Sequence, residues 1–185
     1  MIDWENQWEL HAPNFSKGVA NVHLQEYGGP HLSFQMVPGP GFGDLSHPTT
    51  QLMLYLMPPK ILSPVLDIGC GSGVLSIAAK MRGAPSVIGI DIDPNALMHA
   101  QNNAQLNGVT CRFEKALSAV PENPLILMNM ISSEQKIAWN SLPDFSSYTL
   151  IVSGLPAEEG VPFSHYGPII EEKELSGWKA FKIQK

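Results

Sequence analysis

The sequence predicts an α/β protein built on a mostly parallel β-sheet, and three observations support this fold class. From residue 64 onward, short apolar runs alternate with segments whose apolar residues recur at helical spacing. A glycine-rich loop joins the first run to the first such segment, and an aspartate ends the second run. Strands that alternate with helices form parallel sheets with right-handed crossovers, which is the arrangement expected here.

Seven segments are expected as strands of this sheet. Five are apolar runs expected to lie parallel, at residues 65–68, 87–90, 110–113, 125–128 and 148–152. Helices are expected between them at residues 74–81, from Pro94 to the Asn107-Gly108 stop signal, and around residues 133–139. Residues 169–170 and 178–183 are expected to form an antiparallel hairpin that closes one edge of the sheet.

The first fifty residues follow another pattern. Trp4 and Trp8 are four residues apart, as on one helix face, and residues 19–27 and 31–36 are expected as strands. The Pro/Gly-dense segment 38–43 is expected as a loop, and a short helix is expected to start after Thr49-Thr50. We therefore expect residues 1–50 to be a lead-in with a loop that covers a ligand, and residues 51–185 to be the ligand-binding domain, within a single globular unit.

Composition limits the classes of function. The chain has 185 residues, of which 44% are apolar and 15% are charged, as in a core-forming domain. Its net charge of -6 and scattered basic residues make nucleic acid an unlikely partner, and favour a basic protein. Neither a membrane span nor a secretion signal is recognisable, so a cytoplasmic location is expected. The two cysteines and six histidines lack ligand spacing, so no metal is expected.

The glycine-rich loop runs from Asp67 to Gly73 with glycines at 69, 71 and 73. A dinucleotide fingerprint places its third glycine three residues after the second, whereas here the interval is two. This spacing favours a nucleoside ligand without a diphosphate. Asp91 ends the next strand, where a carboxylate can accept hydrogen bonds from both ribose hydroxyls. The alternative is that Asp91 is only a turn acid beside the helix start at Pro94.

These residues resemble the core of class I S-adenosylmethionine-dependent methyltransferases, and more specifically the bacterial methyltransferases of ribosomal protein L11. The matching stretches are Pro38 to Gly43 with His47-Pro48-Thr49-Thr50, Asp67 to Gly73, Gly89 to Pro94, Asn107-Gly108, Asn129-Met130 and Ser153-Gly154. The resemblance implies a Rossmann-like class I methyltransferase fold, with S-adenosylmethionine as the cofactor of the domain at 51–185.

The resemblance also implies site residues. The expected cofactor contacts are Thr50, Asp67, Gly69, Gly71, Asp91 and Asn129. Thr50 would cap a helix that faces the methionine carboxylate, or would be an N-cap that binds no ligand. Asn129, otherwise an ordinary turn residue, is the expected catalytic residue because its side-chain oxygen would orient the acceptor nitrogen. Phe42, Met128 and Met130 would form an apolar mouth that lowers the pKa of an acceptor amine.

The implied activity is N-methylation of a protein amine, with a ribosomal-protein lysine or N-terminal amine as substrate. Two departures keep alternatives open. Asp44-Leu45-Ser46 stands where the family usually has Thr-Gly-Thr, and nothing corresponds to the family's N-terminal recognition domain. The alternatives are a methyltransferase of another protein or a small molecule, and a relative that binds the cofactor without catalysis. The chain is expected to be either a catalytic fragment or a natural short form.

Overall fold

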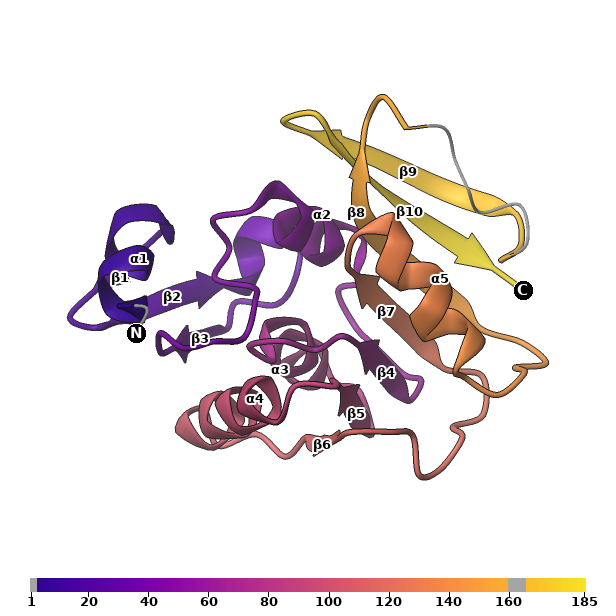
Figure 1. Cartoon of the computed structure of the whole chain (residues 1–185), viewed down its shortest axis with the longest axis horizontal. Coiled ribbons are helices and arrows are strands. Elements are labelled where there is room, and N and C mark those ends of the chain that lie inside the picture. Colours follow the sequence, from indigo (N-terminus) through magenta and orange to yellow (C-terminus); the bar gives the residue numbers. More distant parts are fainter. Residues whose placement is uncertain (1–2, 160–165) are drawn as a thin grey trace.

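The computed structural model describes residues 3–159 and 166–185, and shows an α/β fold (Figure 1). Within this part of the chain, seven strands form one sheet in the order β6-β5-β4-β7-β8-β10-β9. The strands are β4 (Val65–Ile68), β5 (Val87–Ile90), β6 (Arg112–Glu114), β7 (Leu125–Asn129), β8 (Thr149–Pro156), β9 (Ile169–Leu175) and β10 (Trp178–Gln184). The first five are parallel, and β10 pairs antiparallel with both β8 and β9. The predicted fold class is confirmed, including the antiparallel C-terminal hairpin.

Helices cover the two faces of this sheet unequally. The helices are α2 (Pro48–Leu56), α3 (Val74–Met81), α4 (Pro94–Leu106) and α5 (Ser132–Asn140). Side chains of α2, α3 and α4 share one apolar cluster with alternate strand residues such as Val65 and Leu127. The other cluster contains the intervening residues, such as Leu66 and Met128, and is covered by Ala138 and Trp139 of α5. Because successive strand residues point to opposite faces, the continuous apolar runs supply both clusters.

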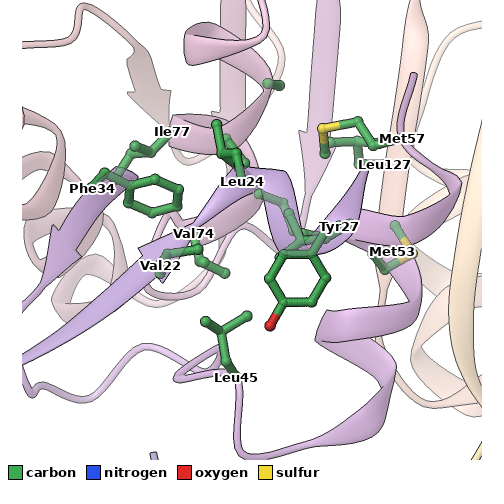
Figure 2. Packing of buried hydrophobic residues seen from close by; sticks show 14 of the residues in the cluster. Val22, Leu24, Tyr27, Phe34, Leu45, Met53, Met57, Val74, Ile77 and Leu127 are labelled. Carbon is green, nitrogen blue, oxygen red and sulfur yellow. The ribbon is translucent and has the colours of Figure 1, made fainter. Parts of the chain in front are cut away.

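The N-terminal segment forms a smaller unit that packs against the helices on one face of the main sheet. It contains α1 (Trp4–His11) and a three-stranded antiparallel sheet of β1 (Phe15–Ser16), β2 (Val19–His23) and β3 (Ser33–Met36). Figure 2 shows Val22, Leu24 and Phe34 packed close to Val74 and Ile77 of α3, and all five belong to one buried cluster. The expected boundary at residue 50 falls inside α2, so the division of the chain there stays a prediction.

Several expected strands have different bounds, and in two of them hydrogen bonds explain the difference. The strand expected at 19–27 ends at His23, and Leu24–Tyr27 forms the 3-10 helix η1. The left-handed conformation of Gly28 and its N–H bond to the Gln25 carbonyl close this turn. The strand expected at 110–113 is β6, Arg112–Glu114. It is shifted because its register with β5 begins at Arg112 opposite Ile88, and the Asp91 N–H extends the pairing to Glu114.

The start of α2 also differs from the expectation. The helix begins at Pro48, and its N-cap is His47, whose side chain accepts from the Thr49 N–H. Proline is favoured in a first helical turn because its missing N–H would have no partner there. Thr50 therefore lies within the first turn and is not the cap. No helix in the described ranges 3–159 and 166–185 is long and apolar enough to cross a membrane.

Candidate functional site

A cleft of about 950 Å³ opens at the carboxyl ends of the parallel strands. Ligands of open α/β sheets bind at this edge, where the loops that follow the strands diverge. Residues directly after β4 and β5 meet there with the last residue of β7 and with side chains from the N-terminal loop and the C-terminal hairpin. The lining residues used below are Gly41, Phe42, His47, Gly69, Gly71, Ile90, Asp91, Ile92, Ala116, Leu117, Asn129, Met130 and Trp178.

The carboxylate of Asp91 is held at the cleft by two backbone donors. One oxygen accepts the Gly71 N–H at 3.0 Å, and the other accepts the Asp93 N–H at 3.0 Å. Gly71 has φ of +52°, a left-handed conformation that glycine adopts without strain. Since each carboxylate oxygen can accept more than one hydrogen bond, both keep capacity for ligand hydroxyls. The glycine loop and the acid therefore form one rigid unit.

The loop at 38–43 lies directly on the glycine loop. The Ser72 N–H donates to the Phe42 carbonyl at 2.8 Å, and the Ser72 hydroxyl donates to the Gly43 carbonyl at 2.9 Å. A β-carbon at Gly41 would overlap the backbone of Gly71 and Ser72, so only glycine allows this approach. Pro40, Gly41 and Phe42 consequently line the cleft as one of its walls.

Asn129 lies at the end of β7 and connects two elements at the cleft. Its amide nitrogen donates to the Thr50 hydroxyl at 3.4 Å, and Thr50 itself is fully buried in α2. This bond holds the Asn129 side chain at the cleft wall. The geometry thus joins two residues that are 79 positions apart in the chain.

His47 and Trp178, which the sequence did not predict at the site, form a group of rings with Phe42 in the cleft lining. The ring of His47 packs edge-on against Trp178 at 4.7 Å between centroids, and against Phe42 at 5.8 Å. Burial lowers the pKa of His47, so its ring is neutral near pH 7. Trp178 begins β10, and only the antiparallel return of that strand brings it to the cleft. Nothing in its local sequence signalled this position.

The predicted site residues do not all reach the cleft. Gly69, Gly71, Asp91 and Asn129 line it, whereas Thr50 contributes through its bond to Asn129. Asp67 lies beneath the glycine loop, fully buried, where it accepts the Ser76 hydroxyl at 2.7 Å. Burial raises the pKa of the Asp67 carboxyl to about 7.

The expected apolar mouth also has different members. Met128 is fully buried in the core under α5 and does not reach the surface of the cleft, so its assignment to the mouth is wrong. It was misassigned because alternate residues of β7 point to opposite faces of the sheet. Met130, which follows the strand, and Phe42 do line the cleft, and Trp178 joins them.

An apolar part of the cleft lining suits a flat ring. It includes Ala116 and Leu117, together with Ile90 and Ile92, the direct sequence neighbours of Asp91. The side chain of Ile92 is 81% exposed, so it is open to contact with a ligand in the cleft. A carboxylate for hydroxyl groups beside an apolar slot is the combination that a nucleoside requires. Among the described residues, no group of three or more His, Cys, Asp or Glu side chains could hold a metal ion.

Comparisons with known proteins agree with this geometry. A family model described as ribosomal protein L11 methyltransferase (PrmA) matches residues 2–140. The ribosomal protein L11 methyltransferase of Glaesserella parasuis is 38% identical over 144 residues, which cover 72% of this chain and 49% of that protein. The corresponding protein of a Geobacter strain is 34% identical over 151 residues, covering 71% and 49%. The chain therefore spans about half the length of the curated relatives it matches.

A solved structure extends the likeness to the fold. The crystal structure of a ribosomal protein L11 methylase from Lactobacillus delbrueckii subsp. bulgaricus superimposes with a TM-score of 0.63 at 26% identity. The match covers 81% of this chain and 83% of that one. Because the family model matches well over half of the residues, the chain belongs to the ribosomal protein L11 methyltransferase family.

Proposed function

We propose that the cleft binds S-adenosylmethionine and that the protein transfers its methyl group to an amine of a protein, with a ribosomal-protein lysine or N-terminal amine as the substrate. The observation that carries this proposal is the Asp91 carboxylate, held by the Gly71 N–H at the mouth of a cleft at the strand ends. Membership of the family supports the same activity.

The residues of the cleft fit this cofactor. Asp91 would accept hydrogen bonds from the two ribose hydroxyls, and the apolar slot of Ile90, Ile92 and Leu117 would hold adenine. The backbone of Gly69 and Gly71, which lines the cleft, would lie alongside the amino-acid tail. Bound S-adenosylmethionine would supply an electrophilic methyl group on a positively charged sulfur. Asp67 is buried, bonded to Ser76 and absent from the cleft lining, so it would not contact the ligand.

The chain's own residues would prepare the acceptor. A lysine amine has an ordinary pKa of about 10.4 and must lose its proton before it attacks. Phe42, Met130 and Trp178 form an apolar surface, which lowers the pKa of an amine by excluding water. The Asn129 side-chain oxygen would orient the neutral nitrogen, while its amide nitrogen stays bonded to Thr50. The proton leaves to water, so the main contribution of the site is alignment.

The net charge of the chain and its similarity to known methyltransferases both favour a ribosomal protein as the substrate. The chain carries a net charge of -6, which complements a basic protein and repels nucleic acid phosphates. The relatives named above are methyltransferases of ribosomal protein L11. We therefore place the protein in the cytoplasm, where ribosomes are.

Cofactor binding is tested first, by isothermal titration with S-adenosylhomocysteine. Asp91→Ala should weaken binding about 10- to 100-fold, because a hydrogen bond to a charged group contributes about 1.5–3 kcal/mol. Glu122→Ala, which removes an exposed acid outside the cleft lining, is the control and should bind like the wild type. If the wild type binds no cofactor at millimolar concentration, the proposal fails.

Methyl transfer is then measured with radiolabelled S-adenosylmethionine and undermethylated ribosomes. Label should appear in a ribosomal protein, and Asn129→Ala should lower turnover at saturating cofactor at least about 10-fold, because the acceptor loses its alignment. Unchanged turnover would remove Asn129 from the mechanism. Cofactor binding without any label in ribosomal proteins would exclude this substrate class.

A further inference from the structure

His99 is a buried imidazole on α4 that plays no part in the proposed chemistry, and both of its ring nitrogens bond to the segment that leads into the cleft wall. It is 5% exposed. Its Nδ1 accepts the Gly41 N–H at 3.1 Å, and its Nε2 lies 2.7 Å from the Val37 carbonyl. A β-carbon at Gly39 would come within 2.6 Å of the ring, so the segment lies flat against the imidazole.

These two partners determine which tautomer the ring adopts. A carbonyl oxygen can only accept, so Nε2 must carry a hydrogen, and a backbone N–H can only donate, so Nδ1 must be unprotonated. The neutral ring satisfies both partners. A second proton on Nδ1 would face the Gly41 N–H, and two donors cannot bond to each other.

The segment that His99 holds is part of the cleft. Gly41 packs against the backbone of Gly71 and Ser72, and the Phe42 carbonyl accepts the Ser72 N–H. Gly71 in turn donates to Asp91. A continuous set of contacts therefore runs from His99 through Gly41 and the glycine loop to the carboxylate proposed to bind ribose.

We propose that His99 is a positioning residue for cofactor binding, whose neutral imidazole clamps residues 37–41 against the glycine loop and releases them when the ring takes up a second proton. The proposal rests on the proposed function for its effect on the cofactor. The clamp itself rests only on the contacts of α4 with the loop.

The described side chains around His99 carry no buried charge, so protonation of His99 itself would control the contact between α4 and residues 37–41. The α1 side chain packed on it is the uncharged Trp8, at 6.0 Å between ring centroids. The titratable side chains of α1, Glu5, Glu9 and His11, are exposed, and residues 37–43 and the rest of α4 carry none. At the start of α4, Asp93 is exposed and bonded to Asn95. Burial lowers the pKa of His99, so the clamp holds at neutral pH and opens on acidification.

Two substitutions separate the clamp from mere packing. His99→Asn places an amide oxygen near the position of Nδ1, accepts from Gly41, and cannot titrate. His99→Leu fills part of the space but accepts no hydrogen bond. At pH 7.5 we expect S-adenosylhomocysteine to bind the Asn variant within about 3-fold of the wild type, and the Leu variant at least about 10-fold more weakly.

The pH profile is the decisive measurement. Between pH 7.5 and 5.0 the affinity of the wild type should fall further than that of His99→Asn, because the two proteins share every other titratable group, including His47 in the cleft. The control His31→Asn, which changes an exposed histidine, should follow the wild type. Equal pH dependence of the wild type and His99→Asn would overturn the proposal.

Amide hydrogen exchange tests the clamp without any ligand. The Gly41 and Ser72 amides should lose protection in His99→Leu, and in the wild type at pH 5.0, but not in His99→Asn at that pH. Unchanged protection in both cases would overturn the clamp. If the wild type binds no cofactor at any pH, the proposed function fails, and this exchange measurement still decides the role of His99.

Discussion

Asp67 and Asp91 show how two aspartates of one motif acquire different roles. The Asp91 carboxylate lies at the cleft, where each of its oxygens accepts a hydrogen bond from a backbone N–H group. Asp67 lies two residues before the first glycine, but it is fully buried and accepts the Ser76 hydroxyl. The first environment suits a ligand, whereas the second stabilises the loop from below and makes ionisation costly.

The buried carboxyl of Asp67 makes stability depend on pH. Because burial raises its folded-state pKa to about 7 from 3.8, the folded protein binds a proton more tightly than the unfolded chain. Stability should therefore be greatest below about pH 3.8 as far as this group is concerned, fall as pH rises towards 7, and be level above it. Asp67→Asn keeps an acceptor for Ser76 and cannot ionise.

We expect Asp67→Asn to gain stability over the wild type as pH rises from 5 to 8, by roughly 2 kcal/mol, since each pKa unit is worth about 1.4 kcal/mol. Urea unfolding at the two pH values measures the difference. Asp144→Asn, at an exposed position, should show no such trend. A difference that does not change with pH would mean that Asp67 is not buried as described.

At the scale of elements, the buried Arg82 joins the ends of three helices. It is the C-cap residue of α3, and its guanidinium donates to the Tyr27 carbonyl at the end of η1 and to the Met57 and Pro58 carbonyls after α2. Burial lowers the pKa of Arg82 to about 10, so it remains charged near pH 7. One side chain thus satisfies carbonyl groups that would otherwise be buried without donors.

Arg82→Met should destabilise the protein by about 2–4 kcal/mol, because methionine replaces the volume but leaves these carbonyls without partners, each at a cost of about 1–3 kcal/mol before relaxation. Urea unfolding measures the loss. Lys60→Met, at an exposed position nearby in the sequence, is the control and should change stability by less than about 0.5 kcal/mol. An equally small effect of Arg82→Met would show that the carbonyls find other donors.

At the scale of the whole molecule, the cleft joins parts of the chain that are far apart in sequence. Its walls include Phe42 before α2, Gly69 after β4, Asn129 at the end of β7 and Trp178 at the start of β10. Of these four residues, Trp178 also packs against the buried cluster that joins the N-terminal unit to the helices. A ligand in the cleft would therefore contact the loop before α2, the ends of the parallel strands and the C-terminal hairpin.

Ligand binding should accordingly stabilise the protein as a unit. S-adenosylhomocysteine at one hundred times its dissociation constant should raise the free energy of unfolding by about 2.7 kcal/mol, through preferential binding to the folded state. Denaturant unfolding with and without ligand measures the increase, and a single transition is expected. Stabilisation confined to residues 51–185, with residues 3–50 unfolding separately, would contradict this expectation.

Local sequence determined the features that depend on near neighbours. The apolar runs, the glycine spacing from Gly69 to Gly73 and the strand-end position of Asp91 each follow from backbone geometry and side-chain alternation over a few residues. They were sufficient for the sheet, its hairpin and the cleft residues Gly69, Gly71 and Asp91, whereas Asn129 was expected from the family resemblance. Element ends were less well predicted, as at β2 and α2, because partners such as Arg82 and His47 decide where the backbone bonds stop.

Only the tertiary structure decided which residues that are distant in sequence contact one another and which of them line the cleft. Trp178 reaches the cleft because β10 returns between β8 and β9, and Met128 leaves it because its strand turns that side chain to the other face. His99 bonds to Gly41, which is 58 residues away in the sequence. Asp67 is bonded to Ser76 in the interior instead of lining the cleft. Such contacts depend on long-range packing and burial, for which the chain carries no signal at short spacing.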